Sequence, residues 1–406
     1  AHNIGAITLN GGTLTSSGNT FFQGNWIFNG DVTVGGSALS TISGLAVGSQ
    51  GGGGTFNVAD SVNGASTDLL VSADITLGSL TKTGAGTMEL TGANTYTGAT
   101  FINEGTLAIT NATALGSTVG ETTINTNAKL NISGGITTAE NITNVGGGGG
   151  KITGGTGGGT FTGLITLTNG IDLRGNDLTF SGGITSTDQG FVINGARYVI
   201  DTTAIDLDSD NSGGAGTFGL TSAGNSKANA TELNVGGNDW GLARINFGGY
   251  LKLGGDNYMP ADAGVEFGWN SVGASSGTLD LNGFDQTVAF LRQAASFPTV
   301  NGNQNITGGG TLTIDTAAGT YDYHGRITDG ATATSLVKAG TGTQILDNNT
   351  GTASNYSGTT TINAGTLALV DASGTNNIAS SSAIDVASGA TLDVSGITNG
   401  FELANG

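Results

Sequence analysis

A short unit returns along the whole chain and limits the folds open to it. The unit reads Gly-Thr-Leu, in places with a second Gly or an Ala before the Thr, and an aliphatic residue usually stands two positions after the Leu. Its copies begin at Gly11, Gly105, Gly277, Gly310, Gly365 and Gly389. Apolar and polar residues alternate within each copy with a period of two, which predicts a β-strand with one buried face. Because Gly or Asn bounds most runs, we expect strands of about 4–6 residues separated by tight turns.

The composition supports β structure and excludes several other classes. Glycine makes up 76 of the 406 residues, and each glycine inside a helix would cost roughly 1 kcal/mol relative to alanine. Only 2 prolines are present, so the chain is neither collagen-like nor polyproline, because both need proline to fix φ. The low charged fraction of 10% argues against disorder. No apolar run approaches the roughly 18 residues that would span a bilayer.

Two architectures are built from many short strands, namely sandwiches of antiparallel hairpins and solenoids of stacked coils. Hairpins join longer strands through Asn-Gly or Asp-Gly turns, whereas here the strands are short and one sequence keeps returning. In a solenoid like residues stack at about 4.8 Å, and Asn, Thr and Val ladders are self-complementary. We therefore predict an all-β parallel β-helix with about 20–25 residues per coil. No shift in composition marks a boundary, so we expect one continuous solenoid over residues 1–406.

The charge balance excludes some partners. The 30 acidic and 11 basic residues give a net charge of −19, which argues against binding to nucleic acid or to an anionic membrane surface. No cysteine is present, which excludes disulfides and thiolate metal sites. We expect no cofactor. The chain opens on Ala1 without a methionine, as a processed export product does.

Two longer segments share one pattern, which begins Leu-x-Lys-x-Gly-x-Gly-Thr and ends Tyr-x-Gly-x-Thr-x-Ile-Asn-x-Gly-Thr-Leu. They span residues 80–107 and 336–367. This pattern closely resembles the autotransporter-associated β-strand repeat of secreted bacterial surface proteins. The resemblance implies a right-handed parallel β-helix that is exported from a Gram-negative-type cell and lies outside it or on its surface. The family's translocator does not follow residue 400, so we expect it to have been removed or export to use another route.

Particular positions of the repeat have predicted roles. We expect Lys82 and Lys338, which precede the Gly-x-Gly turns, to lie on the solvent face. The glycines are expected at corners with positive φ. Tyr96 and Tyr356 are expected to pack inside a coil or to cap a corner.

Titratable groups that could do chemistry are scarce, since the chain has 2 histidines. Asp322, His324 and Arg326 alternate and would share one face of a strand, with Tyr321 and Tyr323 on the other. This arrangement is consistent with an acid/base cluster or with a sugar-binding strip whose tyrosines stack on rings. The alternative, which we favour, is that these are variable outward positions of no special role. We predict no catalytic residue and a protein that is not an enzyme.

An acidic stretch is the candidate calcium site. Asp206, Asp208 and Asp210 place alternate carboxylates where they could converge on one Ca²⁺ ion. The stretch lacks the glycine and the closing glutamate of an EF-hand, and it does not repeat. A solvated acidic loop is the alternative interpretation.

The function predicted first is a non-enzymatic extracellular β-solenoid with a structural or adhesive role. Strand-like sequence reaches both termini, and an uncapped coil pairs readily with another strand. We therefore predict head-to-tail self-association into a filament. The residues expected at that contact are Ile4, Ile7, Leu9, Ile397, Phe401 and Leu403.

Two alternatives remain open. The first is a monomeric adhesin that binds surface carbohydrate, with Trp240, Trp269 and Tyr250 as stacking platforms or, more plainly, as aromatics packed under loops. The second is a polysaccharide-processing enzyme, such as a lyase that uses Asp-bound Ca²⁺ and a Lys or Arg base.

Overall fold

The computed structural model describes residues 2–16, 26–44, 47–49, 54–61, 67–146, 148–187, 189–207, 216–221, 226–268, 276–294, 304–347, 354–371 and 378–398. These residues form short β-strands and one 3-10 helix, η1 (Lys227–Asn229), and contain no α-helix. The chain divides into two compact units, Ala1–Ser186 and Thr187–Gly406.

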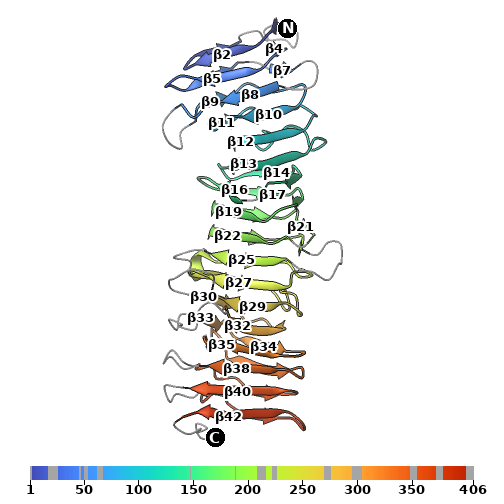
Figure 1. Cartoon of the computed structure of the whole chain (residues 1–406), viewed down its shortest axis with the longest axis vertical. Helices are drawn as coiled ribbons and strands as arrows, with labels where there is room; N and C mark the ends of the chain where they lie inside the picture. Colours follow the sequence, from blue (N-terminus) through green and yellow to red (C-terminus); the bar gives the residue numbers. More distant parts are fainter. Residues whose placement is uncertain are drawn as a thin grey trace. The chain divides into compact units, whose positions relative to one another are not determined.

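In the first unit, strands from successive coils lie one above another and pair in parallel (Figure 1). One column contains β2 (Ile7–Asn10), β5 (Val32–Gly35), β8 (Gly54–Val58), β10 (Leu80–Thr83), the first halves of β12 (Thr100–Ile109) and β13 (Thr122–Ile132), β15 (Ile142–Asn144), β18 (Ile165–Leu167) and β21 (Ile184–Ser186). A second contains β3 (Thr13–Thr15), β6 (Ser40–Ser43), β9 (Leu69–Val71), β11 (Thr87–Leu90), the second halves of β12 and β13, β16 (Gly148–Gly154) and β19 (Ile171–Asn176). Shorter columns contain β1 (His2–Ile4), β4 (Trp26–Phe28) and β7 (Val47–Ser49), and then β14 (Ile136–Thr138), β17 (Gly159–Phe161) and β20 (Leu178–Phe180).

The second unit follows the same plan. Its first column contains β22 (Phe191–Ala196), β25 (Thr217–Thr221), β27 (Leu242–Asn246), β29 (Gly264–Phe267) and β32 (Phe290–Gln293). The next contains β23 (Val199–Ile200), β26 (Thr231–Leu233), β28 (Gly249–Leu253), β30 (Gly277–Asp280), β33 (Gln304–Thr307) and β36 (Arg326–Ile327). Towards the C-terminus two columns contain β31 (Gln286–Val288), β34 (Gly310–Asp315), β37 (Thr334–Ala339), β39 (Thr360–Ile362) and β41 (Ile384–Val386), and β35 (Thr320–Tyr323), β38 (Thr343–Asp347), β40 (Thr366–Asp371) and β42 (Thr391–Ile397). The two-residue strand β24 (Ile205–Asp206) also belongs to this unit.

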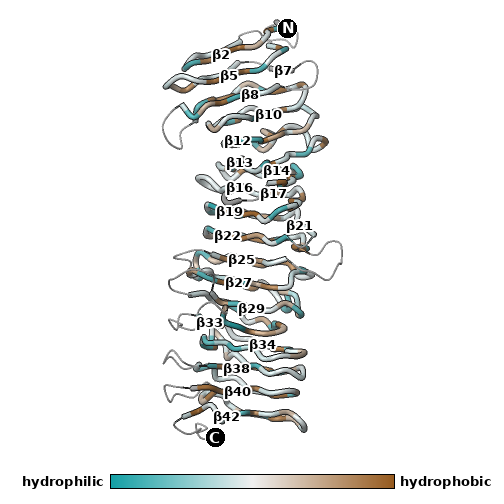
Figure 2. Tube along the Cα trace, viewed as in Figure 1, coloured by the Kyte–Doolittle hydropathy of each residue, from teal (hydrophilic) through white to brown (hydrophobic). Residues whose placement is uncertain are grey.

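The core of each unit is a set of apolar ladders that run from coil to coil. Leu69, Met88, Leu107, Leu130, Ile152 and Leu173 are register partners in turn, and all of them are buried. In the second unit Leu251, Leu279, Ile306 and Ile327 form a ladder of the same kind. Apolar residues recur along the trace of successive coils in Figure 2. The period of two follows because alternate side chains of each strand point into the coil, where they stack on the inward side chains of the next coil.

The parallel β-solenoid predicted from the sequence is confirmed. Ile7 pairs with Val32, 25 positions later, and Ile102 pairs with Ile124, 22 positions later, as expected for coils of 20–25 residues. Coil length nevertheless varies, because Leu251 pairs with Leu279, 28 positions later. Every strand pairing with a described register is parallel, which contradicts the sandwich of hairpins.

The two lysines of the repeat lie inside the coil, so the prediction of solvent exposure was wrong. Lys82 is fully buried, and its Nζ donates to the carbonyl oxygens of Thr83, Gly84 and Glu104 at 2.9, 2.7 and 3.1 Å. Burial lowers the pKa of Lys82 to about 8. The ammonium thus satisfies carbonyls at a coil corner that strand pairing leaves free.

The second copy of the repeat builds the same corner. Lys338 is also fully buried and donates to the carbonyls of Ala339, Gly340 and Ala364. Burial again lowers the lysine pKa. Gly340 has φ +68°, as predicted for these corner glycines.

The repeat tyrosines pack within the coil, as one of the two predicted roles had it. Tyr96 and Tyr356 are buried, and each hydroxyl lies 2.6 Å from the hydroxyl of a threonine four positions later, Thr100 or Thr360. Burial raises the pKa of Tyr356 to about 12, so the phenol stays protonated over the physiological range. The repeat therefore encodes a buried polar network together with the apolar ladder.

The predicted self-association residues fall into two groups. Leu9 is buried, whereas Ile4, Ile7 and Ile397 are half-buried in the first and last described strands. Phe401 and Leu403 lie outside the described residues.

Candidate functional site

One part of the second unit, between β27 and β38, carries three neighbouring groups of polar and aromatic side chains. They are an arginine–glutamate ladder, an aromatic pair beside a cavity, and an aspartate–histidine cluster. Each group is formed by residues from successive coils, so parallel stacking brings together side chains that are more than 20 positions apart in sequence.

The ladder consists of Arg244, Glu266 and Arg292, which are register partners on β27, β29 and β32. Nε of Arg244 lies 2.5 Å from Oε1 of Glu266, and Nε of Arg292 lies 2.7 Å from Oε2. The Glu266 side chain is 6% exposed, and each of its oxygens accepts a hydrogen bond from one guanidinium. A buried carboxylate paired on both sides ties three coils together, and the group keeps one net positive charge.

The aromatic pair is Phe290 and Tyr321. Their rings are stacked with centroids 4.0 Å apart and an interplanar angle of 3°. Phe290 is the register partner of Gly264, and a Cβ at that glycine would collide with the Phe290 ring. The guanidinium of Arg292 lies 5.1 Å from the Phe290 centroid. Because Gly264 has no side chain, the Phe290 ring fits against it, and Arg292 of the ladder contacts the same ring.

A cavity of about 400 Å³ opens beside the aromatic pair. Its lining residues are Ala261, Asp262, Ala289, Phe290, Asp315, Thr316, Ala317, Ala318 and Tyr321. The two aspartates are exposed, and they are the charged residues of the lining. Thr316 is 1% exposed, and its buried Oγ1 has no hydrogen-bond partner among the described residues. The cavity therefore combines two aromatic side chains, several small side chains and two carboxylates that can accept hydrogen bonds.

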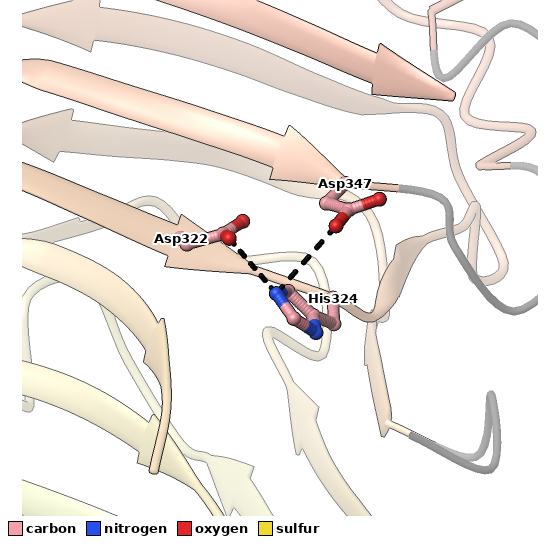
Figure 3. A group of neighbouring side chains, drawn as sticks. All are labelled: Asp322, His324 and Asp347. Atoms are coloured by element: carbon pink, nitrogen blue, oxygen red, sulfur yellow. Dashed lines mark hydrogen bonds and ion pairs between the residues drawn. The ribbon is translucent and has the colours of Figure 1, made fainter. Parts of the chain in front are cut away.

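The third group consists of Asp322, His324 and Asp347, shown in Figure 3. Asp322 lies on β35, His324 follows that strand directly, and Asp347 ends β38 on the next coil. Nε2 of His324 lies 2.9 Å from Oδ2 of Asp322 and 3.6 Å from Oδ2 of Asp347. The hydrogen bond that His324 donates to the Asp322 carboxylate raises the pKa of His324, burial opposes this, and both aspartate charges add to the rise.

The structure brings together part of the predicted Asp322, His324 and Arg326 arrangement. Asp322 and His324 bond to each other, but β35 ends at Tyr323 and the chain turns at Gly325. Arg326 lies on β36, which pairs with β33, so the three residues do not share one strand face. No hydrogen bond or ion pair between described residues joins Arg326 to the other two.

Asp347 was not predicted as part of this group. Asp347 lies on the coil after His324, 23 positions later in the sequence. The predicted coil length of 20–25 residues is the signal that would have indicated this residue. Tyr323, which was predicted to face away from the group, is fully buried, and its hydroxyl donates to the carbonyl of Arg326 at 3.1 Å. Burial raises its pKa far above the usual range, so it does not titrate near neutral pH.

Two of the three aromatic residues predicted for sugar stacking, Trp240 and Tyr250, are engaged by other residues of the structure. Trp240 is buried and stacks on Phe218 with centroids 4.9 Å apart. Tyr250 is half-buried, and its hydroxyl donates to Asp280 at 2.7 Å. Trp269 lies outside the described residues. The packed alternative therefore holds for Trp240, and Phe290 with Tyr321 forms the aromatic pair that lines a cavity.

The predicted calcium residues are only partly described. Asp206 lies on β24 and its backbone forms a parallel bridge with Asp239, while Asp208 and Asp210 lie outside the described residues. No helix in the described part of the chain is long and apolar enough to cross a membrane.

Comparisons with known proteins agree with this fold and with the repeat. The passenger-associated transport repeat matches residues 80–109 and 336–369, the segments whose buried lysines and tyrosines are described above. The adhesin BmaC autotransporter of Brucella suis biovar 1 (strain 1330) is 30% identical over an alignment of 454 residues, and this alignment covers 94% of the chain. The chain is an autotransporter passenger-like β-helix repeat protein.

This passenger-like chain spans 13% of the length of that adhesin. No solved structure matches it. The first repeat match, at residues 80–109, belongs to the first unit, whereas the second, at residues 336–369, includes Asp347 of the aspartate–histidine cluster. The second match also includes most of β37, which pairs with β34, the strand that ends at the cavity residue Asp315.

Proposed function

We propose that this passenger-like chain is an adhesive segment of a protein outside a Gram-negative cell, and that it acts by binding rather than by catalysis. The similarity to an autotransporter named as an adhesin supports this proposal. The fold supports it as well, because a stack of coils is a stiff scaffold that presents surface side chains at fixed spacing.

The ligand proposed for the cavity is a neutral carbohydrate. Aromatic edges beside small side chains give apolar contact to a sugar ring, and the carboxylates of Asp262 and Asp315 accept hydrogen bonds from hydroxyls. The same carboxylates repel acidic sugars, since no lysine or arginine is among the described residues that line the cavity. A volume of about 400 Å³ is in the range of small-molecule sites.

One observation carries this proposal, namely that the stacked pair Phe290 and Tyr321 lines one cavity together with the exposed carboxylates of Asp262 and Asp315. The test is a glycan array probed with the purified chain and with Tyr321→Ala. We expect the chain to bind neutral glycans and Tyr321→Ala to lose that binding. Equal binding by the Tyr250→Phe control verifies specificity, and a preference for acidic glycans would contradict the proposal.

Head-to-tail association is a second proposal. Within the described residues, β42 has a pairing with β40 and β2 has a pairing with β5. A strand edge that is open in the purified chain pairs readily with another strand. Sedimentation velocity at rising concentration and electron microscopy of the purified chain test it. Filaments that shorten when Ile7 is replaced by Lys are expected, and a monomer at high concentration would contradict the proposal.

A further inference from the structure

We propose that Asp322, His324 and Asp347 bind one divalent transition-metal ion of the Zn²⁺ type. The proposal does not depend on carbohydrate binding, because its residues differ from those that line the cavity.

The three side chains have the separations that a small ion needs. Nε2 of His324 is 2.9 Å from one carboxylate oxygen and 3.6 Å from the other, and one ligand atom from each residue lies within 4.8 Å of the rest. Ligands bound at about 2.1 Å around a tetrahedral or octahedral ion are roughly 3.0–3.5 Å apart. An ion among these atoms therefore requires shifts of about 1 Å or less at the side-chain tips.

The backbone arrangement presents the three ligands together. Asp322 and His324 are two positions apart and point to the same side of the chain. The register pairs Tyr323 with Leu346, so Asp347 lies next to His324 on the following coil. On the following coil Val370 is the register partner of Asp347, and it offers no ligand atom. Within the described residues the cluster thus has three protein ligands, as open zinc sites do.

Exposure and charge favour an ion over a buried pair alone. The side chains of His324 and Asp347 are 12% and 11% exposed, whereas that of Asp322 is 44% exposed, which leaves one side open to water. Oδ1 of Asp322 is a buried atom without a hydrogen-bond partner in the described part of the chain, so it remains available as a second oxygen ligand. Two carboxylates beside one imidazole form a site rich in negative charge, and the mixed nitrogen and oxygen donors suit Zn²⁺ better than Ca²⁺.

The orphaned Nδ1 of His324 does not oppose the proposal. This atom is buried and has no partner among the described residues. In the neutral ring one nitrogen is a donor and the other an acceptor, so Nδ1 is unsatisfied whether Nε2 faces the aspartates or an ion.

The test uses the full chain after treatment with EDTA. Calorimetric titration with ZnCl₂ in excess Mg²⁺ should show one bound ion per chain. A thermal melt with Zn²⁺ should show a raised melting temperature, and Co²⁺ as a probe should give the visible absorption bands of a coordinated ion. His324→Gln and Asp347→Asn should weaken binding by about 100-fold or more, because even residues that only support a ligand change metal affinity by roughly 10–100-fold.

Controls separate binding from folding. His2→Gln replaces the other histidine and should bind as the original chain does. Asp322→Asn changes the most exposed ligand, and its circular dichroism spectrum checks that the fold is retained. The proposal is overturned if the unaltered chain binds no Zn²⁺, if the folded ligand variants bind it equally well, or if Ca²⁺ binds there in preference.

Discussion

Lys82 donates a 2.7 Å hydrogen bond to the backbone carbonyl of Gly84, and Lys338 makes the same bond to Gly340 at 2.9 Å in the second copy of the repeat. Both lysines are fully buried. Each of the two copies of the repeat therefore specifies a lysine inside its coil, and this lysine hydrogen-bonds to the carbonyls of a corner.

Replacing this lysine should destabilise the coil. Lys82→Met keeps the length of the side chain but leaves three carbonyls without their donor. We expect a loss of about 1–3 kcal/mol in the free energy of unfolding, because buried polar groups would lose their partner. Urea unfolding followed by circular dichroism measures it. Lys129→Met, at an exposed lysine of the same unit, is the control and should change the midpoint little.

The corner glycine should resist substitution. Gly84 has φ +76°, and a Cβ there would collide with the carbonyl oxygen of Val58 on the preceding coil. We expect Gly84→Ala to cost more than about 1 kcal/mol, since both the backbone angle and the contact are unfavourable. Gly12→Ala is a matched control, because no atom lies within 4 Å of a Cβ at that position. A thermal melt that shows equal shifts for the two variants would argue against this packing.

An apolar ladder should be sensitive to truncation. Leu107 is fully buried between its register partners Met88 and Leu130. Leu107→Ala should lower the free energy of unfolding by about 2–5 kcal/mol through lost burial and the cavity that remains. Phe101→Ala, at a side chain that is 39% exposed on the same strand, should change it much less. Comparable losses in urea unfolding would mean that the ladder is not the core.

A buried acid should make stability depend on pH. Burial raises the pKa of Glu140 from 4.5 to about 7, although Thr122 donates a hydrogen bond to it. The raised pKa means that the folded chain holds this proton more tightly, so the contribution to stability is complete below pH 4.5 and is lost as the pH rises to 7. Glu140→Gln should therefore be more stable than the original chain by roughly 1–3 kcal/mol at pH 8 and little different at pH 4. Unfolding curves at both pH values test this, with Asp31→Asn, at an exposed carboxylate of the same unit, as control.

The fold could be predicted from the alternating residues and glycines of the repeat. The site could not, because it depends on coil lengths that vary along the chain. The alternation around Leu107 and the glycines of the repeat were sufficient to predict stacked parallel strands. Lys82 was misplaced because a lysine usually lies on the surface, and its partners are backbone carbonyls that no side-chain pattern reveals. Similarly, Phe290 and Tyr321 meet 31 positions apart, beyond the usual coil length, because coils vary in length.

Hydrogen–deuterium exchange of the chain with and without a neutral oligosaccharide tests the central claim, that this passenger-like stack adheres through the cavity beside Phe290 and Tyr321. The account predicts slower exchange of the amides of residues 261–263, 289–291 and 315–321, and no such protection in Tyr321→Ala. Binding that leaves these amides unchanged, and protects residues elsewhere in the chain, would contradict it.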